Sequence, residues 1–408
     1  MKPLGPIPAG FSAIDGELAI GGRKASDLVA EAGTTPLFVY SRDMLRGRVA
    51  ALRAAMPARL KIHYAIKANP WRPVLEEMAG LVDGFDVASA GELAMVRAAG
   101  IDSSLVSFAG PGKRDDELER AIAEGCTINL ESEGEARRAL AIGERLSIRP
   151  RLAIRVNPSF ELRGSGMKMG GGAKQFGIDE ERVPALGREI VTAGAEWCGL
   201  HIFTGSQALD AEAIAETQAN VLALADRLAG EIGAPLAKLN MGGGFGIPYF
   251  NGDAPLDIAA VGAALEERFA SLPASLAGTE LCIELGRYLT GEAGVYLTRI
   301  VDRKVSHGHT FLITDGGLHH QLAASGNFGT VVRRNYPLAV ATRFDAAPEE
   351  EVSVVGCLCT PLDRLADQAH LPRADVGDLV AVFCAGAYGA TASPADFLGH
   401  GPARQLLV

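Results

Sequence analysis

The chain has 408 residues and a net charge of −10, with 48% hydrophobic and 22% charged residues. This length is too great for one ordinary core, so we expect a large barrel domain and a second domain. The composition excludes a disordered chain, and the acidic balance argues against a nucleic-acid or anionic-membrane surface. No apolar run is long enough to span a membrane, and the N-terminus lacks the apolar segment of a signal peptide, so we expect a cytoplasmic protein.

The six cysteines contain no CxxC pair, which argues against a zinc ribbon or a thioredoxin-type motif. Four of them stand in apolar, strand-like runs, as buried thiols of a cytosolic protein usually do. We therefore expect reduced cysteines that have no disulfide or metal role.

Short apolar runs alternate with helical patterns through the first two thirds of the chain. Apolar residues between the runs recur at spacings of three and four, which indicates amphipathic helices. Strand–helix alternation predicts parallel strands joined by crossover helices, and the repeat predicts an α/β fold with a (β/α)8 TIM barrel over residues 35–289. The expected strands are 61–68, 84–89, 105–110, 126–132, 151–157, 198–206, 238–246 and 281–288.

After Tyr288 the pattern becomes β-rich with few helical stretches. We expect a second domain, a β-barrel or sandwich, formed by residues 1–34 and 290–408. Residues 34–41 are expected to form the strand that leads into the barrel.

Polar residues follow the apolar runs, where a barrel of this type places its active site. Lys67 is the clearest example, because it follows the apolar run HYAI. A lone lysine at a strand end most often extends its ammonium group to solvent. With Glu284 and a glycine-rich turn at other strand ends, the alternative of a Schiff-base lysine is favoured.

Four further patterns bear on the chemistry. The glycines of residues 241–246 would let backbone amides approach a phosphate, although a tight turn explains them equally well. The Gly/Lys-rich loop 164–177 suits a flap over the site or an ordinary surface loop. Residues 110–115 lack the spacing of a Walker motif. The histidines at 319, 320 and 400 are interpreted as structural, because adjacent strand residues point to opposite faces, and no metal site is expected.

Eight short motifs occur in an order that resembles a known family: HYAIKANP, GFDVASAGEL, LAIRVNP, HIFTGSQ, NMGGGFGIPYF, IELGRY, GCLCTPLD and AGAYG. Together they resemble the pyridoxal-phosphate decarboxylases of the alanine-racemase fold, which act on diaminopimelate, ornithine and arginine. KMGGGAKQFGID, HIFTGSQ, GGGFGIPYF and FLGH resemble two narrower branches. One is the decarboxylases associated with exosortase A gene clusters, and the other is the glutamyl-carrier-protein decarboxylase of butirosin biosynthesis.

The resemblance implies pyridoxal phosphate as cofactor and assigns roles around it. Lys67 would form the internal aldimine, and Glu284 would keep the pyridine nitrogen protonated. Asp86 and Arg155 would lie near the ring, and Phe203 would stack on it. The residues expected around the phosphate are Ser206, Gly243, Gly244, Arg287 and Tyr388.

The resemblance also implies a head-to-tail homodimer with shared active sites. Cys359 of the partner subunit would protonate the product, and Asp363 would contact the substrate amine. Arg287, Thr360 and Tyr388 complete the expected substrate contacts. The implied activity is decarboxylation of an α-amino acid or of an aminoacyl group on a carrier protein.

Two positions depart from the diaminopimelate decarboxylase pattern. Phe203 stands where those enzymes have a histidine, so it can stack on a ring but cannot titrate. Thr360 stands where they have the carboxylate that holds the distal ammonium of the substrate. A diamino acid substrate is therefore in doubt, and a neutral or acylated distal end is expected.

Three alternatives remain at this point. A racemase of the same fold is disfavoured, because racemases place an arginine at the position of Glu284. Diaminopimelate decarboxylase of lysine biosynthesis is the second alternative. A non-catalytic protein that binds pyridoxal phosphate is the third, and the added β domain argues against it.

Overall fold

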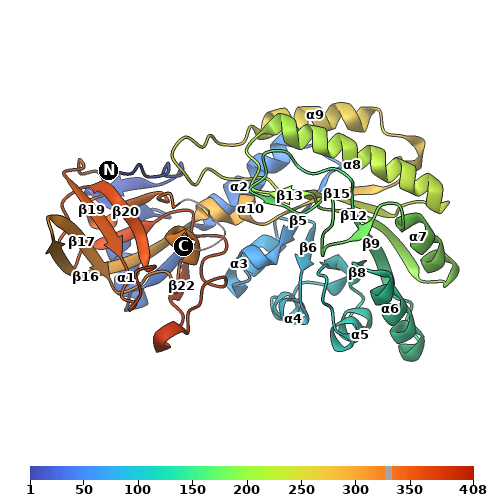
Figure 1. Cartoon of the computed structure of the whole chain (residues 1–408), viewed down its shortest axis with the longest axis horizontal. Coiled ribbons are helices and arrows are strands. Elements are labelled where there is room, and N and C mark those ends of the chain that lie inside the picture. The colour runs from blue at the N-terminus through green and yellow to red at the C-terminus, as the bar shows by residue number, and fades with distance from the viewer. Residues whose placement is uncertain (327–332) are drawn as a thin grey trace. The chain divides into compact units, whose positions relative to one another are not determined.

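The computed structural model describes residues 1–326 and 333–408, which form two compact units (Figure 1). The first unit combines Met1–Arg48, Ile247–Ala254 and Arg287–Val408. The second combines Val49–Gly246 and Pro255–Gly286. The chain passes between the units four times, and the passages after Gly246 and after Gly286 occur just after the strands that carry the glycine-rich turn and Glu284.

The second unit is a closed barrel of parallel strands. Its strands follow one another in the order β9-β12-β14-β15-β5-β6-β7-β8, and pairing of β8 with β9 closes the ring. Strands of this kind are covered on both faces, which is why they read as unbroken apolar runs. All eight runs expected from the sequence are present, so the predicted TIM barrel is confirmed. The strands are β5 (Lys61–Ala65), β6 (Gly84–Val87), β7 (Val106–Phe108), β8 (Thr127–Leu130), β9 (Arg151–Asn157), β12 (Glu196–Ile202), β14 (Lys238–Gly243) and β15 (Glu280–Leu285).

The helices of this unit pack around the strands (Figure 1). Several begin with a side-chain cap: the Ser89 hydroxyl accepts from the Glu92 amide, and the Ser132 hydroxyl from the Glu135 amide. Such caps fix where a helix starts relative to the strand before it. The helices are α2 (Arg42–Ala55), whose first part belongs to the other unit, α3 (Arg72–Ala79), α4 (Ala90–Ala98), α5 (Asp115–Ala123), α6 (Glu133–Leu146), α7 (Val183–Thr192), α8 (Ala211–Ile232) and α9 (Ile258–Ala270).

The first unit is β-rich, as expected from the sequence. Its main sheet runs β18-β21-β16-β17-β19-β20, and β4 pairs with both β16 and β22. The main strands are β4 (Leu37–Tyr40), β16 (Gly294–Ser306), β17 (His309–Thr314), β18 (Leu338–Val340), β19 (Glu350–Val355), β20 (Arg364–Leu371), β21 (Leu379–Val382) and β22 (Arg404–Leu407). A small sheet of β1 (Ser12–Ile14), β2 (Glu17–Ile20) and β3 (Arg23–Lys24), with the helices α1 (Ala25–Ala32) and α10 (Arg287–Thr290), completes it.

The strand over residues 37–40 lies in a different sheet from the one expected. It was expected to lead into the barrel, but β4 pairs antiparallel with β16 and parallel with β22 in the β-rich unit. All four of its residues are buried. An apolar run buried on both faces fits either sheet equally well, so its pattern could not distinguish them.

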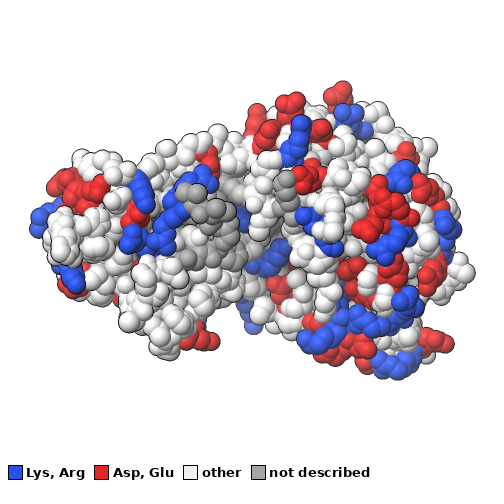
Figure 2. Space-filling model, viewed as in Figure 1, with Lys and Arg blue, Asp and Glu red and all other residues white. Residues whose placement is uncertain are grey.

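Acidic and basic side chains are interspersed over the face of the barrel shown in Figure 2. Part of this mixing is ion pairing between helices α5 and α6, where Arg138 meets Asp115 at 2.6 Å and Arg145 meets Glu119 at 2.7 Å. Within the described residues, no helix is long and apolar enough to cross a membrane.

Candidate active site

A cavity of about 270 Å³ opens at the carboxyl ends of the barrel strands. The strand register brings residues distant in sequence to this level: Glu284 pairs with His63, Ala65 with Asp86, and Arg155 with His201. Most of the lining residues come from strand ends and the loops that follow them. They are Ala65, Lys67, Asp86, Val87, Ala88, Glu92, Ala109, Gly110, Pro111, Arg155, Met169, Phe176, His201, Phe203 and Glu284.

Glu284 is a buried carboxylate held by two side chains. His201 Nε2 lies 3.0 Å from its Oε2, and the Asn240 amide donates to the same oxygen at 3.0 Å. Burial raises the pKa of Glu284, but the charges of His201 and Lys67 lower that pKa more strongly, to below its ordinary value. Glu284 is therefore ionised at neutral pH, and it can hold a proton on a base placed against it.

Asn240 connects Glu284 to the glycine-rich turn. Its side-chain oxygen accepts from the Gly242 amide at 2.9 Å, while its amide group donates to Glu284. A single side chain thus fixes the carboxylate and the start of the turn together. Sequence reasoning missed Asn240, although a polar residue within an apolar strand is the kind of signal that could have found it.

Glu131, another residue not predicted from sequence, organises the opposite wall. Its carboxylate meets Arg155 Nη1 at 2.8 Å and accepts from the Gly110 and Gly177 amides at 2.7 Å each. Arg155 in turn lies over the ring of Phe176, at 4.9 Å from its centroid. Glu131 directly follows strand β8. The expectation that polar residues at strand ends line the site could therefore have identified it.

The loop 164–177 contributes to the cavity wall. Its strand β10 (Met167–Lys168) pairs with β13 (Gly205–Ser206), and Met169 and Phe176 line the cavity. Of the two alternatives left open by its composition, the structure favours a covering loop attached to the site.

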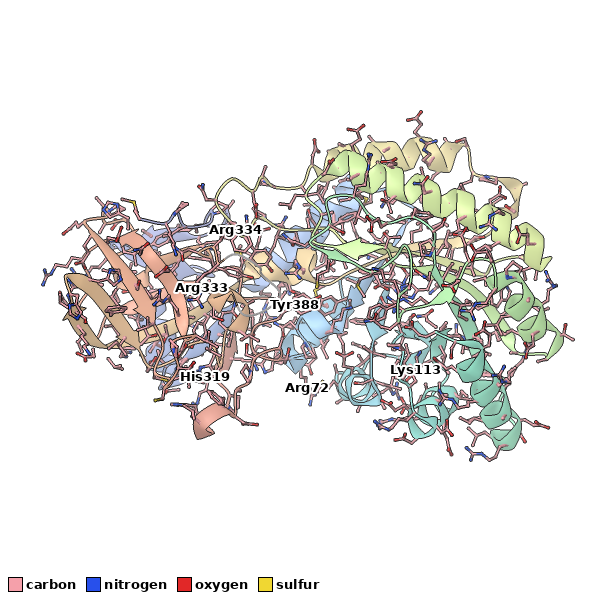
Figure 3. The ribbon with its side chains drawn as sticks, viewed as in Figure 1. Arg72, Lys113, His319, Arg333, Arg334 and Tyr388 are labelled. Carbon is pink, nitrogen blue, oxygen red and sulfur yellow. The ribbon has the colours of Figure 1, made fainter. Side chains whose placement is uncertain are left out.

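Two lysines near the barrel end differ in their partners (Figure 3 labels Lys113). Lys113 is buried, and its ammonium donates to the Gly110 and Asn129 carbonyls and to Glu135 at 2.7–2.9 Å. Lys113 therefore has a structural role. Lys67 is exposed just after β5, lines the cavity, and lies with its Nζ 5.8 Å from the centroid of the Phe203 ring. This leaves Lys67 as the lysine suited to covalent chemistry at the cavity.

The glycine-rich turn after β14 has no room for side chains. A Cβ on Gly243 would lie 2.0 Å from the Glu284 carbonyl oxygen, and one on Gly244 would lie 2.3 Å from that of Gly205. Gly242 and Gly244 also adopt positive φ angles of 68° and 79°. The alternative that these glycines only form a tight turn is thus supported in part, because backbone packing alone requires glycine at these positions.

Two predicted residues of the β-rich unit, Arg287 and Tyr388, lie together. The Arg287 guanidinium donates to the Tyr249 hydroxyl at 2.8 Å and lies 4.8 Å from the centroid of the Tyr388 ring. Arg287 begins α10, immediately after the strand that carries Glu284. Burial opposes its charge, but Tyr249 and Tyr388 keep the pKa of Arg287 above its ordinary value.

The loop after β19 carries Cys359, which is exposed, and the half-buried Thr360. Asp363 is 3% exposed, and its two oxygens accept from the Leu318 and Leu358 amides at 2.7 and 2.8 Å. These bonds tie two loops together and give Asp363 a structural role. Its predicted contact with the substrate amine stays a prediction.

Comparison with known proteins points to one family. Residues 42–291 match the pyridoxal-dependent decarboxylase, pyridoxal binding domain. The chain is 36% identical to the L-glutamyl-[BtrI acyl-carrier protein] decarboxylase of Niallia circulans over 384 residues, covering 91% of this chain and 88% of that protein. It is 33% identical to the diaminopimelate decarboxylase of Archaeoglobus fulgidus, covering 98% and 93%. The crystal structure of diaminopimelate decarboxylase from M. jannaschii has the same fold, with a TM-score of 0.87 at 24% identity and coverage of 97% and 92%.

The residues present fit pyridoxal phosphate. The Ser206 hydroxyl and both carboxylate oxygens of Asp86 are buried without a hydrogen bond in the described structure, although His63 Nδ1 lies 3.5 Å from Asp86 Oδ2. Unpaired buried polar atoms of this kind are costly unless a ligand completes them. The ionised Glu284, Lys67 at the cavity and the side-chain-free turn at Gly243 supply the remaining features that the cofactor requires.

We predict that the cofactor attaches to Lys67. Reduction of the purified protein with borohydride should fix pyridoxal phosphate to the peptide that contains Lys67, as read by peptide mass spectrometry. Lys67→Ala should abolish the fixed label. Lys61→Ala, at the opposite end of the same strand, should retain it. Labelling of a different lysine in the unaltered protein would refute the assignment.

We predict that Glu284→Gln lowers turnover without releasing the cofactor. Its carboxylate supplies the charge that holds the ring proton, and removal of one such electrostatic partner costs about 100-fold or more in kcat. The measurements are CO2 release and the cofactor absorbance of the same sample. Glu280→Gln, an exposed residue at the start of β15, is the matched control and should keep both. Equal turnover in the two variants would show that Glu284 does not hold the proton.

Proposed function

The chain belongs to the pyridoxal-dependent decarboxylases, and from this premise we propose which residues perform each part of its reaction and which substrate it accepts. The protein is a carboxy-lyase that uses pyridoxal phosphate. Its relatives are named decarboxylases, and the fold is that of the diaminopimelate enzymes. The alternative of a non-catalytic binding protein is accordingly set aside.

Decarboxylation leaves an electron pair on Cα when the carboxylate departs as CO2. Pyridoxal phosphate, when bound, supplies the electron sink for that pair. In our proposal Glu284 holds a proton at the ring nitrogen, and His201 and Asn240 keep the carboxylate oriented through their contacts with its Oε2. An ionised carboxylate at this point favours decarboxylation over racemisation, because the sink stays fully charged.

The cavity walls keep the reacting groups in place. We assign Phe203 to stacking on the cofactor ring, with Lys67 on the same side, as the distance between them allows. Ser206 and the turn at Gly243 and Gly244 would bind the phosphate through a hydroxyl and backbone amides. Arg287 and Tyr388 would add a charge and a hydroxyl to the same group. Asp86 and Arg155 would contact the ring from the opposite wall.

Cys359 is proposed to act across a subunit boundary. In a head-to-tail homodimer, Cys359 of the partner subunit would return a proton to the product at Cα. The exposure of this thiol supports the proposal, since a buried cysteine could not reach a second chain. The six cysteines are all free, which supports the expectation of a reducing, cytoplasmic compartment.

We propose a substrate whose distal end is neutral or acylated, such as a glutamyl group carried by a protein. The observation that supports it is Thr360, which offers a hydroxyl where a carboxylate would pair with a distal ammonium. Asp363 is poorly placed to replace that carboxylate, because it is 3% exposed and each of its oxygens accepts from a backbone amide. The name of the Niallia circulans relative, a decarboxylase of a glutamyl group on an acyl-carrier protein, agrees with this class.

We predict that inactive variants complement one another. Lys67→Ala and Cys359→Ala homodimers should each be inactive. After subunit exchange, half of the dimers are mixed and each has one intact site, so about a quarter of the normal activity should return. Subunit exchange is checked by mass-tagged chains. Mixed dimers that regain no CO2 release would overturn the shared-site proposal.

We predict a strong preference against diaminopimelate. The missing charge-assisted contact is worth about 1.5–3 kcal/mol, which corresponds to about 10- to 100-fold in kcat/KM. CO2 release should therefore be greater from a glutamyl-carrier protein than from free diaminopimelate, and Thr360→Glu should shift the ratio toward diaminopimelate. Thr360→Ser serves as the control and should leave the ratio unchanged. Efficient turnover of diaminopimelate by the unaltered protein would overturn this proposal and would support the alternative of a diaminopimelate decarboxylase of lysine biosynthesis.

A further inference from the structure

Three segments of the β-rich unit bring together two imidazoles and a thiol. His319 lies in the turn after β17, Cys357 follows β19, and His400 precedes β22 (His319 is labelled in Figure 3). One nitrogen from each ring and the Cys357 sulfur all lie within 4.8 Å of one another. The Cys357 Sγ is 3.9 Å from His400 Nε2, and the rings of His319 and His400 have centroids 4.7 Å apart.

His319 is the unusual member of this cluster. Its side chain is fully buried, yet neither ring nitrogen has a hydrogen-bond partner among the described residues. Its neighbour His320, also buried, contacts the Tyr296 hydroxyl at 3.2 Å and the Gly401 carbonyl oxygen at 2.9 Å. Leaving a buried polar group without a hydrogen bond costs about 1–3 kcal/mol. An imidazole without a hydrogen-bond partner beside a thiol therefore indicates a bound ligand.

No metal site was expected at His319, His320 and His400, because adjacent histidines on a strand would point to opposite faces. His319 and His320 instead lie in a turn outside the strands, with ring centroids 3.8 Å apart. Cys357 was not among the expected candidates for this site. The two residues that complete the cluster stand 38 and 81 positions further along the chain (357 − 319 and 400 − 319). Only the folded chain places them beside His319.

Two imidazoles and one thiolate form a ligand set that zinc prefers. Zinc binds sulfur at about 2.3 Å and nitrogen at about 2.0 Å in a tetrahedral arrangement, so neighbouring ligand atoms lie about 3.3–3.8 Å apart. The 3.9 Å between Cys357 and His400 is already close to that spacing. Small side-chain rotations would draw the third ligand in.

The backbone beneath the cluster is held in position. Asp363 accepts from the Leu318 amide, next to His319, and from the Leu358 amide, next to Cys357. A Cβ on Gly317 or Gly356 would lie 2.0 or 2.2 Å from its carboxylate oxygens, so both loops pack directly on this side chain. Two of the three ligand-bearing segments are therefore fixed relative to each other before any ion binds.

We propose that His319, Cys357 and His400 form a zinc site with a fourth position open to water. The ion would join the segment before β22 to the two loops that Asp363 holds. The three ligands all belong to the β-rich unit, and none of them is among the residues assigned to the cofactor or the substrate.

Cobalt(II) is a suitable probe of this site, because thiolate ligation gives Co²⁺ a strong charge-transfer absorption. Difference spectra of the holoenzyme with and without Co²⁺ should show this band and reach saturation at one ion per chain. Excess Zn²⁺ should remove the band, and zinc should raise the Tm of the holoenzyme. The cofactor also binds metals, so the variants decide where the ion lies.

Cys357→Ser should abolish the charge-transfer band and the zinc-dependent rise in Tm. His400→Gln should weaken cobalt binding at least tenfold. Both residues are exposed, so these variants test the site even if His319→Gln fails to fold. Cys359→Ser, an exposed cysteine two positions away, is the matched control and should keep the band. No band in the unaltered protein, a band that survives in Cys357→Ser, or a band lost in Cys359→Ser would each overturn the proposal.

Discussion

The contact of the Glu284 carboxylate with His201 inside the barrel is the interaction on which the site depends. A carboxylate buried there would normally take up a proton, since burial raises its pKa. The positive groups around it reverse this tendency and lower the pKa of Glu284 below its ordinary value. We propose that decarboxylation needs this charge, and the barrel surrounds the carboxylate with His201, Asn240 and Lys67 from three other strands or the turns that follow them.

Two other buried acids, Glu131 and Asp363, hold loops in place through several hydrogen-bond donors. Glu131 holds Arg155 and accepts from the amides of two loops, so a single carboxylate shapes a wall of the cavity. Asp363 performs the corresponding task in the β-rich unit with backbone amides alone. In each case a buried carboxylate with several donors ties loops together.

The assignment of Asp363 to a structural role narrows the choice of substrate. A decarboxylase that accepts a distal ammonium must present an unpaired carboxylate to it. Thr360 has no charge, and Asp363 already has two backbone partners. On our proposal, the chain combines the carboxy-lyase activity of its family with changed surroundings for the substrate's far end.

The sequence alone determined the barrel and many of its candidate site residues. Strand periodicity located all eight barrel strands, and polar residues at strand ends together with the family resemblance selected Lys67, Asp86, Arg155 and Glu284, which line the cavity, as well as Ser206. It could not place Leu37–Tyr40, because a strand buried on both faces fits either sheet. It passed over Asn240 and Glu131, because their role is set by partners on other strands. Tertiary structure alone decided the cluster of His319, Cys357 and His400, since contacts between residues so far apart in the chain depend on how the strands between them fold, which local periodicity does not encode.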